Sequence, residues 1–163
     1  MKSTIGICII GIGIMLSGCT PVGTLRDGTK PVLYSASEVQ SWPVVNEARQ
    51  FNNDIRIYIH PTAKVDHDAQ LGNGVRIGAR TKIDEDTSVY PNVTIGEDVV
   101  IGGDAVIHED VQIGHHAKIG GDARLGAGTV VKPYGYVRTH ATVKPDSIVE
   151  AAERPKPGTQ AAR

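Results

Sequence analysis

The side chains of this sequence that could do chemistry are mainly imidazoles and carboxylates. The six histidines are His60, His67, His108, His115, His116 and His140. Imidazole is a common zinc ligand, and three imidazoles that leave one position open bring the pKa of a zinc-bound water close to neutrality. None of them has another histidine five residues away, and the adjacent pair His115 and His116, together with His108, supplies the candidate metal ligands.

Four aspartates are spaced eighteen residues apart, namely Asp68, Asp86, Asp104 and Asp122. If the chain coiled once every eighteen residues, their carboxylates would stack about 5 Å apart, as neighbouring strands do. Such a column could bind calcium, whose ligands are oxygen atoms. Aspartate at a turn also commonly accepts hydrogen bonds from nearby backbone N–H groups, so the column has a structural interpretation as well.

These side chains lie on a strict six-residue repeat. Every sixth position from 59 to 143 is Ile, Leu or Val, and the residue two places before each of them is small or β-branched. Because side chains two apart on a strand share a face, each hexad offers one large and one small side chain to the same interior. The aliphatic series is Ile59, Val65, Leu71, Ile77, Ile83, Val89, Ile95, Ile101, Ile107, Ile113, Ile119, Leu125, Val131, Val137 and Val143.

Each hexad also carries the residues of a tight corner. Glycine follows the aliphatic residue in seven hexads, and the fourth position, counted from the aliphatic residue, is usually Asp, Asn or Gly. These residue types tolerate the positive φ that a corner requires. Short strands joined by such corners can bury a one-sided stripe only by coiling around it, so the sequence predicts an all-β fold, a parallel β-helix.

Three stretches resemble the hexapeptide-repeat family. Residues 59–63 (Ile-His-Pro-Thr-Ala) look like the start of the β-helix in lipid A acyltransferases, and residues 125–131 (Leu-Gly-Ala-Gly-Thr-Val-Val) look like the last coil of many acetyltransferases. Residues 77–108 are similar to the metal-binding part of γ-class carbonic anhydrases. The resemblance implies a left-handed β-helix with three hexads per coil, hence five coils over residues 59–149, and a homotrimer.

An acyltransferase is one activity that the resemblance implies. Acetyltransferases of this family end with a proline pair and an Ala-Gly-Asn-Pro-Ala-Lys stretch that helps to hold coenzyme A, and residues 132–138 do not match it. Those enzymes commonly place the catalytic histidine in or beside a loop that interrupts the repeat. No loop interrupts these hexads, so an acyltransferase remains the alternative to a non-catalytic protein.

A zinc-dependent anhydrase is the other implied activity. Matched by motif, the three zinc-ligand positions fall on Tyr90, Gly103 and His108, so two of the three histidines are missing. The expectation is therefore no cofactor, with zinc as the alternative. His108 and Tyr90, one coil apart in one column, are the candidate catalytic residues or a structural contact. The adjacent side chains of His115 and His116 are expected to diverge into solvent.

The start of the sequence resembles a bacterial lipoprotein signal. Lys2 precedes an apolar run from Ile5 to Leu16, and the Leu-Ser-Gly-Cys stretch of residues 16–19 resembles the site at which the signal is cut and the cysteine is acylated. The resemblance implies a signal segment over 1–18 and fatty acyl chains such as palmitate on Cys19. Thr20 stands where an aspartate would favour the inner membrane, so the expected location is the outer membrane, facing the periplasm.

The other segments are assigned from composition and capping residues. Residues 19–34 are expected to be a tether, 35–58 a helical cap with a strand leading into the β-helix, and 150–163 a disordered tail. Ser35 and Glu38 have the spacing of a capping box before a short helix, and Pro43 could start a second helical turn through Arg49.

The net charge of −1 gives no basic excess that would suggest a nucleic-acid partner. Most outward positions just before an aliphatic residue are polar, but the third coil has Val100 and Val106 there, on adjacent faces. These two valines are expected at the interface of a homotrimer. The sequence thus predicts a lipid-anchored periplasmic scaffold or binding module, with an envelope protein or a glycan as its partner.

Overall fold

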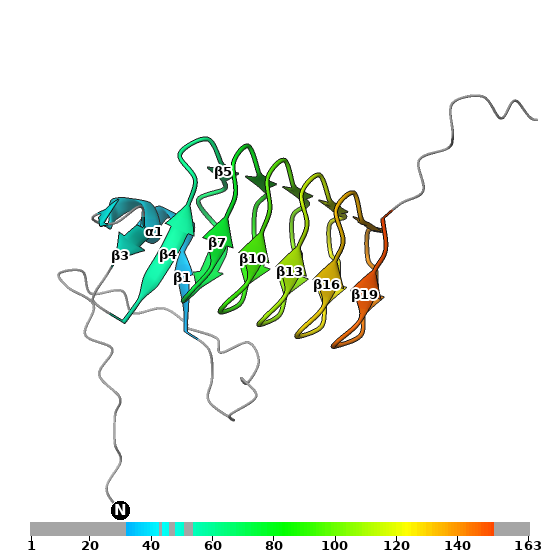
Figure 1. Cartoon of the computed structure of the whole chain (residues 1–163). Coiled ribbons are helices and arrows are strands. Elements are labelled where there is room, and N and C mark those ends of the chain that lie inside the picture. The colour runs from blue at the N-terminus through cyan, green and yellow to red at the C-terminus, as the bar shows by residue number, and fades with distance from the viewer. Residues whose placement is uncertain (1–31, 43, 46–47, 51–53, 152–163) are drawn as a thin grey trace, which may run out of the picture.

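The computed structural model describes residues 32–42, 44–45, 48–50 and 54–151, and most of them form a parallel β-helix with three faces (Figure 1). The first face consists of β4 (Arg56–Ile59), β7 (Arg76–Ile77), β10 (Thr94–Ile95), β13 (Gln112–Ile113), β16 (Val130–Val131) and β19 (Ile148–Val149). The second face consists of β5 (Lys64–Val65), β8 (Lys82–Ile83), β11 (Val100–Ile101), β14 (Lys118–Ile119) and β17 (Tyr136–Val137). The third face consists of β6 (Gln70–Gly72), β9 (Ser88–Val89), β12 (Val106–Ile107), β15 (Arg124–Leu125) and β18 (Thr142–Val143).

Each strand pairs with the strands one coil before and after it. Ile95, for example, is in register with Ile77 on one side and Ile113 on the other, eighteen residues away in both directions. The predicted three hexads per coil are therefore confirmed. In Figure 1 the strands of the near face run upward, pass over the top to the second face and return one step to the right, which is a left-handed coil.

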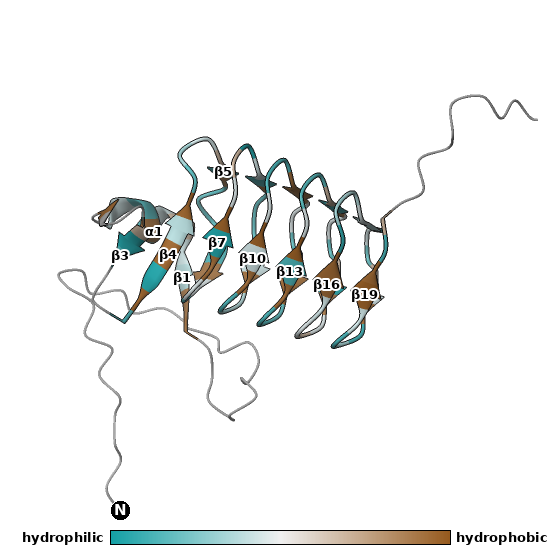
Figure 2. Cartoon of the chain, in the orientation of Figure 1, coloured by the Kyte–Doolittle hydropathy of each residue, from teal (hydrophilic) through white to brown (hydrophobic). Residues whose placement is uncertain are grey.

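The predicted aliphatic stripe forms the interior. Its members from Leu71 to Val137 are almost fully buried, whereas Ile59, Val65 and Val143, which lie in the end coils, are half-buried. Apolar bands recur in successive strands and polar residues gather in the corners (Figure 2). This pattern is the one-sided burial that the six-residue repeat predicts.

The corners follow the same repeat. Left-handed backbone recurs every six residues, at Gly74, Arg80, Asp86, Asn92, Asp98, Asp104, Asp110, His116, Asp122, Gly128, Tyr134, His140 and Asp146. The prediction for the fourth position is thus confirmed. The seven glycines that follow aliphatic residues do not have positive φ, and the conformational reason expected for them is wrong. A Cβ atom on Gly114 would lie 2.5 Å from the backbone nitrogen of Pro133 in the next coil, so the close approach of the coils requires glycine there.

A cap covers the N-terminal end of the helix. Strand β1 (Leu33–Ser35) pairs antiparallel with β6 and begins within the segment expected to be a tether. The short helix α1 (Ala36–Ser41) follows, and the Ser35 hydroxyl accepts a hydrogen bond from the Glu38 backbone N–H at 3.2 Å. Val39 and Trp42 are buried against the first coils.

The second helical turn expected between Pro43 and Arg49 is not formed. Strands β2 (Val44–Val45) and β3 (Ala48–Gln50) pair antiparallel with each other, and β3 pairs with β4. The β-branched side chains of β2 favour this extended backbone, and the ladder covers the exposed edge of β4.

The described residues contain no helix long and apolar enough to cross a membrane. The predicted signal segment, Cys19, most of the tether and the tail beyond residue 151 lie outside the described residues.

Candidate functional site

The corner between the first and second faces, here called the first corner, carries a continuous column of polar side chains. Its left-handed position is occupied by Arg80, Asp98, His116 and Tyr134, one residue per coil. The Arg80 backbone N–H donates to the Thr62 hydroxyl at 3.0 Å, which extends the column into the first coil.

Arg80 is held by two carboxylates of the next coil. Its Nε and Nη2 atoms donate to the two carboxylate oxygens of Asp98 at 2.8 and 2.6 Å, and Nη2 also reaches Glu97 at 3.2 Å. The hydrogen bond from Arg80 holds the pKa of the Asp98 carboxyl below its ordinary value, and Asp98 raises the pKa of the Arg80 guanidinium in turn. Both groups therefore stay charged at neutral pH.

Three aromatic rings continue the column. The His116 ring stacks on Tyr134 with a centroid separation of 4.9 Å, and His115 contacts His116 and Tyr134 edge-on at 5.4 and 5.5 Å. His115 and His116 are exposed, as expected, but their rings lie in contact and do not diverge, because Tyr134 of the following coil packs against both. His116 Nδ1 also faces the Asp98 carboxylate at 3.9 Å.

The first corner differs from the other two in the residues that adopt the left-handed conformation. Three of the four left-handed residues described at the first corner are neither Asp, Asn nor Gly, compared with one of four at the second corner and none of five at the third. A non-glycine residue in this conformation costs on the order of 1 kcal/mol, and such strain often collects at functional sites. The long side chains of Arg80, His116 and Tyr134 are thus presented at a conformational cost.

Two cavities lie along the first corner. One of about 600 Å³ has a largely apolar lining that includes Ile59, Pro61 and Ile77. Its charged or titratable residues are Arg49, Tyr58, His60 and Glu97. The other, of about 530 Å³, is lined by Arg80, Gly96, Glu97, Asp98, Gly114, His115 and His116. Glu97 belongs to both linings, so the two cavities adjoin, and together they offer apolar, ionic and aromatic contacts to a ligand.

The second corner contains the predicted aspartate column. Asp86, Asp104 and Asp122 adopt the left-handed backbone conformation, which aspartate tolerates well at a turn. His140 Nδ1 lies 3.3 Å from Asp122, so the last described carboxylate of this column faces an imidazole. These contacts favour the structural interpretation of the column.

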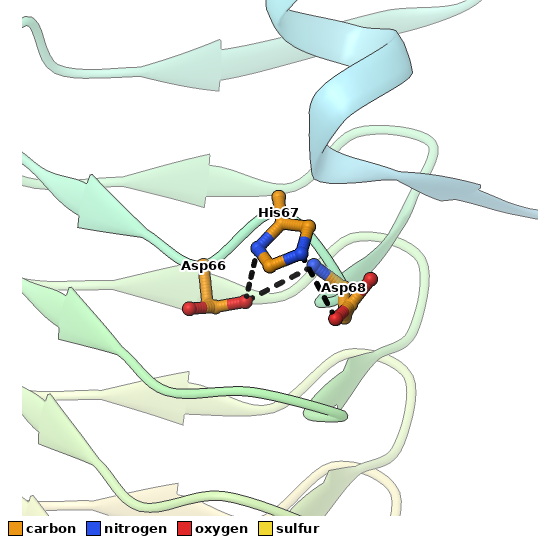
Figure 3. Close-up of side chains that lie close together, drawn as sticks. All are labelled: Asp66, His67 and Asp68. Carbon is orange, nitrogen blue, oxygen red and sulfur yellow. Dashed lines mark hydrogen bonds and ion pairs between the residues drawn. The ribbon is translucent and has the colours of Figure 1, made fainter.

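At the same corner, Asp66, His67 and Asp68 are the described residues whose ligand atoms converge closely enough for a metal ion (Figure 3). The Asp66 carboxylate lies 3.0 Å from Nδ1 of His67, and the Asp68 carboxylate lies 3.1 Å from Nε2 of the same ring. One ion cannot be bound through both nitrogens of an imidazole, which point in opposite directions. The arrangement is that of an exposed ring between two carboxylates.

The third corner brings the two candidate catalytic residues together. The rings of Tyr90 and His108 lie 5.1 Å apart, and Tyr90 is buried. His108 Nδ1 lies 3.8 Å from the carboxylate of Glu109, whose side chain is only 10 % exposed. Burial, and to a lesser extent the Glu109 charge, raises the pKa of the Tyr90 hydroxyl. Gly103 lies at the second corner, so the three matched ligand positions are not gathered within one chain.

Several residues of these corners were not singled out by the sequence analysis, chiefly Arg80, Glu97, Asp98 and Glu109. Their signal is visible only when the sequence is written in rows of eighteen, where Asp98 stands directly above His116 and Glu97 directly above His115. The two valines of the third coil lie on adjacent faces as predicted, with Val100 exposed and Val106 half-buried.

The comparisons with known proteins agree with the repeat. Residues 75–108 and 104–139 match the family described as bacterial transferase hexapeptide (six repeats). A comparison with curated proteins finds no match.

Solved structures with similar coils include a hexapeptide transferase family protein from Anaplasma phagocytophilum (16 % identity, 61 % of this chain and 72 % of that one, TM-score 0.45). Others are perosamine N-acetyltransferase from Caulobacter crescentus (21 %, 58 % and 45 %, TM-score 0.41) and serine acetyltransferase from Entamoeba histolytica (23 %, 64 % and 38 %, TM-score 0.36). The chain spans less than half of each of these two acetyltransferases. Residues 75–139 therefore carry hexapeptide repeats of the bacterial transferase type.

Proposed function

We propose that this protein is a lipid-anchored, homotrimeric binding module of the bacterial envelope, without catalytic activity of its own. The observation that carries the proposal is the first corner. Long side chains occupy strained positions there, and two adjoining cavities lie along the same column. Glycine, asparagine or aspartate would relieve the backbone strain at these positions. Long side chains that are kept there in spite of the strain are best explained by contact with a bound partner, such as an envelope protein or a glycan.

The absence of catalysis is tested by an acyl-transfer assay, because acyl transfer is the chemistry that the fold most readily suggests. The full chain, purified in mild detergent, is incubated with acetyl-coenzyme A and a panel of amine and hydroxyl acceptors. The proposal predicts coenzyme A release no faster than from the His108→Ala variant. Release that is clearly faster in the wild type and lost in that variant would contradict it.

An acyltransferase is the second candidate, and one observation favours it. A histidine beside a buried carboxylate is the arrangement of a general base with its orienting group, and His108 and Glu109 have that arrangement at the third corner. Their separation of 3.8 Å is longer than a hydrogen bond. This is why the module, and not the enzyme, is the function proposed here.

The anchor and the address rest on the sequence of residues 16–20. Cys19 would carry the lipid, and Thr20 favours the outer membrane with the coils in the periplasm. The Cys19→Ala variant should lose metabolic labelling by a fatty acid, because the thiol that would carry the acyl chain is gone. Labelling that persists in Cys19→Ala would show that the anchor lies elsewhere.

A further inference from the structure

The cavity of about 530 Å³ at the first corner has a polar lining. Among the described residues, the lining consists of two glycines and five side chains that can form hydrogen bonds, two of them carboxylates. The centre of a protein–protein interface, by contrast, is built on apolar and aromatic anchors and is depleted of Asp and Glu. The cavity therefore suits a small polar ligand better than the anchor residue of a protein partner.

The charges of the lining nearly cancel. Arg80 faces two carboxylates, those of Glu97 and Asp98, and binds both of them. An anionic ligand would be repelled by the surplus carboxylate, and a cationic ligand would compete with Arg80 for the same oxygens. A neutral ligand that carries hydrogen-bonding groups avoids both costs.

Polar atoms remain for such a ligand. Arg80 binds the carboxylates through Nε and Nη2, which leaves the two N–H groups of Nη1 outside these bonds. Glu97 accepts through Oε2, so its Oε1 lies outside them as well. Because the bidentate pair with Asp98 fixes the guanidinium, a donor and an acceptor are held close together at this corner. Neighbouring hydroxyl groups of a sugar can accept from the one and donate to the other.

An aromatic surface adjoins these polar groups. His116 lies nearly parallel to Tyr134 at 4.9 Å, His115 contacts both rings edge-on, and all three side chains are exposed. The face of an aromatic ring is partially negative and attracts the weakly positive C–H groups on one side of a sugar ring. A sugar ring is about as long as one coil step of about 4.8 Å. An oligosaccharide along the corner would thus place one sugar against the rings and the next against Arg80 and Glu97.

The proposed trimer leaves this corner open. Val100 lies on the second face and Val106 on the third, and these faces meet at the second corner. Packing around the second corner keeps the first corner accessible from solvent.

We propose that the first corner binds a neutral oligosaccharide, with Arg80 and Glu97 hydrogen-bonded to its hydroxyl groups and the rings of His115, His116 and Tyr134 stacked on its sugars. This inference rests on the proposed function and names the chemical class of its partner.

The test measures binding by calorimetry of neutral tetrasaccharides of glucose, mannose, galactose and N-acetylglucosamine. The full chain is purified in a detergent without a sugar headgroup, which would compete for the site. At least one tetrasaccharide should bind saturably at millimolar concentration or below, and His116→Asn should weaken that binding about threefold to tenfold through the loss of a stacked ring. Arg80→Asn should weaken it as well. Asparagine tolerates left-handed backbone, so circular dichroism should show the coils of both variants intact.

His140→Asn is the matched control. His140 also has left-handed backbone and faces an aspartate one coil before it, Asp122, but it lies at the second corner. Its replacement should leave the affinity unchanged. A wild type that binds none of the tetrasaccharides, or binding that is unchanged in both His116→Asn and Arg80→Asn, would overturn the saccharide site.

A second measurement separates this inference from the proposed function. A photoreactive amino acid replaces His116 in one variant and His140 in another, and crosslinking is carried out in cells. Crosslinking to one envelope protein from position 116 and not from position 140, without any saccharide binding in the calorimeter, would overturn the inference and leave the module standing. The absence of both crosslinking and saccharide binding would overturn the inference and the module together.

Discussion

At the scale of single residues, the ion pair between Arg80 and Asp98 shows how one corner position supports the next. The pair is bidentate, and its partners stand one coil apart, so it adds a side-chain contact to the backbone ladder. Asp98 is the only aspartate among the four described left-handed residues of the first corner, and it is paired on both sides, with Arg80 before it and His116 after it.

The pair predicts a specific pH dependence of stability. Because Arg80 holds the pKa of Asp98 below its ordinary value of 3.8, the folded protein favours the ionised carboxyl. The stabilisation is complete above the unfolded-state pKa and is lost as the pH falls through the lower, folded-state pKa. Urea unfolding should therefore show wild type more stable than Asp98→Asn near neutral pH, with the difference shrinking once the pH falls below 3.8. A difference that persists undiminished in stronger acid would contradict the role given to this carboxyl.

The positions of the turns could be predicted from the sequence, but the grouping of side chains at the first corner could not. Asp, Asn and Gly tolerate left-handed backbone, so their six-residue period locates the turns without knowledge of the fold. Arg80, His116 and Tyr134 read as isolated exceptions to that period. They become a group only when the coil length is known, because contacts between residues eighteen apart are invisible in a linear reading.

At the scale of the elements, the short distance between neighbouring coils limits the size of the residue that fits at some corner positions. Gly72, Gly114 and Gly126 each lie beneath a proline of the next coil, and a Cβ on any of them would come within 2.5 Å of that proline's nitrogen. Backbone, unlike a flexible side chain, cannot move aside without disturbing the adjacent ladder.

Gly114→Ala should therefore be costly. We expect it to lower the free energy of unfolding by about 1–3 kcal/mol, the usual cost of overpacking. The matched control is Gly103→Ala, where the nearest atom to the added Cβ is the Glu85 carbonyl oxygen at 3.2 Å and a smaller loss is expected. Denaturant unfolding of both variants measures the difference, and equal losses would show that the contact with the next coil is not what selects glycine.

Besides β1, which begins in the expected tether, the sequence did not predict the antiparallel pair of β2 and β3. Its strands are two and three residues long, too short for a period of two to be recognised, and Pro43 suggested a helix start. Its pairing depends on the edge of β4, which exists only once the first coil has formed. The fold of the coils, by contrast, follows from a repeat that runs through fifteen hexads.

At the scale of the whole molecule, the large apolar or aromatic side chains exposed on the described coils are Val100, Tyr134, Tyr136 and Ile148. Val100 is 40 % exposed on the second face and Val106 is half-buried on the third, between polar outward neighbours such as Lys82, Lys118 and Ser88. Two outward valines in one coil, on faces that meet at an edge, are the expected pattern for a closed cyclic assembly that packs those faces together.

The central claim, a trimeric module, is tested most directly by light scattering of the full chain in detergent, corrected for bound detergent. The account predicts the mass of three chains for the wild type at micromolar concentration. It predicts dissociation of the double variant Val100→Glu with Val106→Lys, whose side chains point away from the interior, so that circular dichroism stays unchanged. The control pair Thr94→Glu with Gln112→Lys, outward on the first face, should remain trimeric. A monomeric wild type, or a Val100→Glu with Val106→Lys variant that stays fully trimeric, would contradict the account.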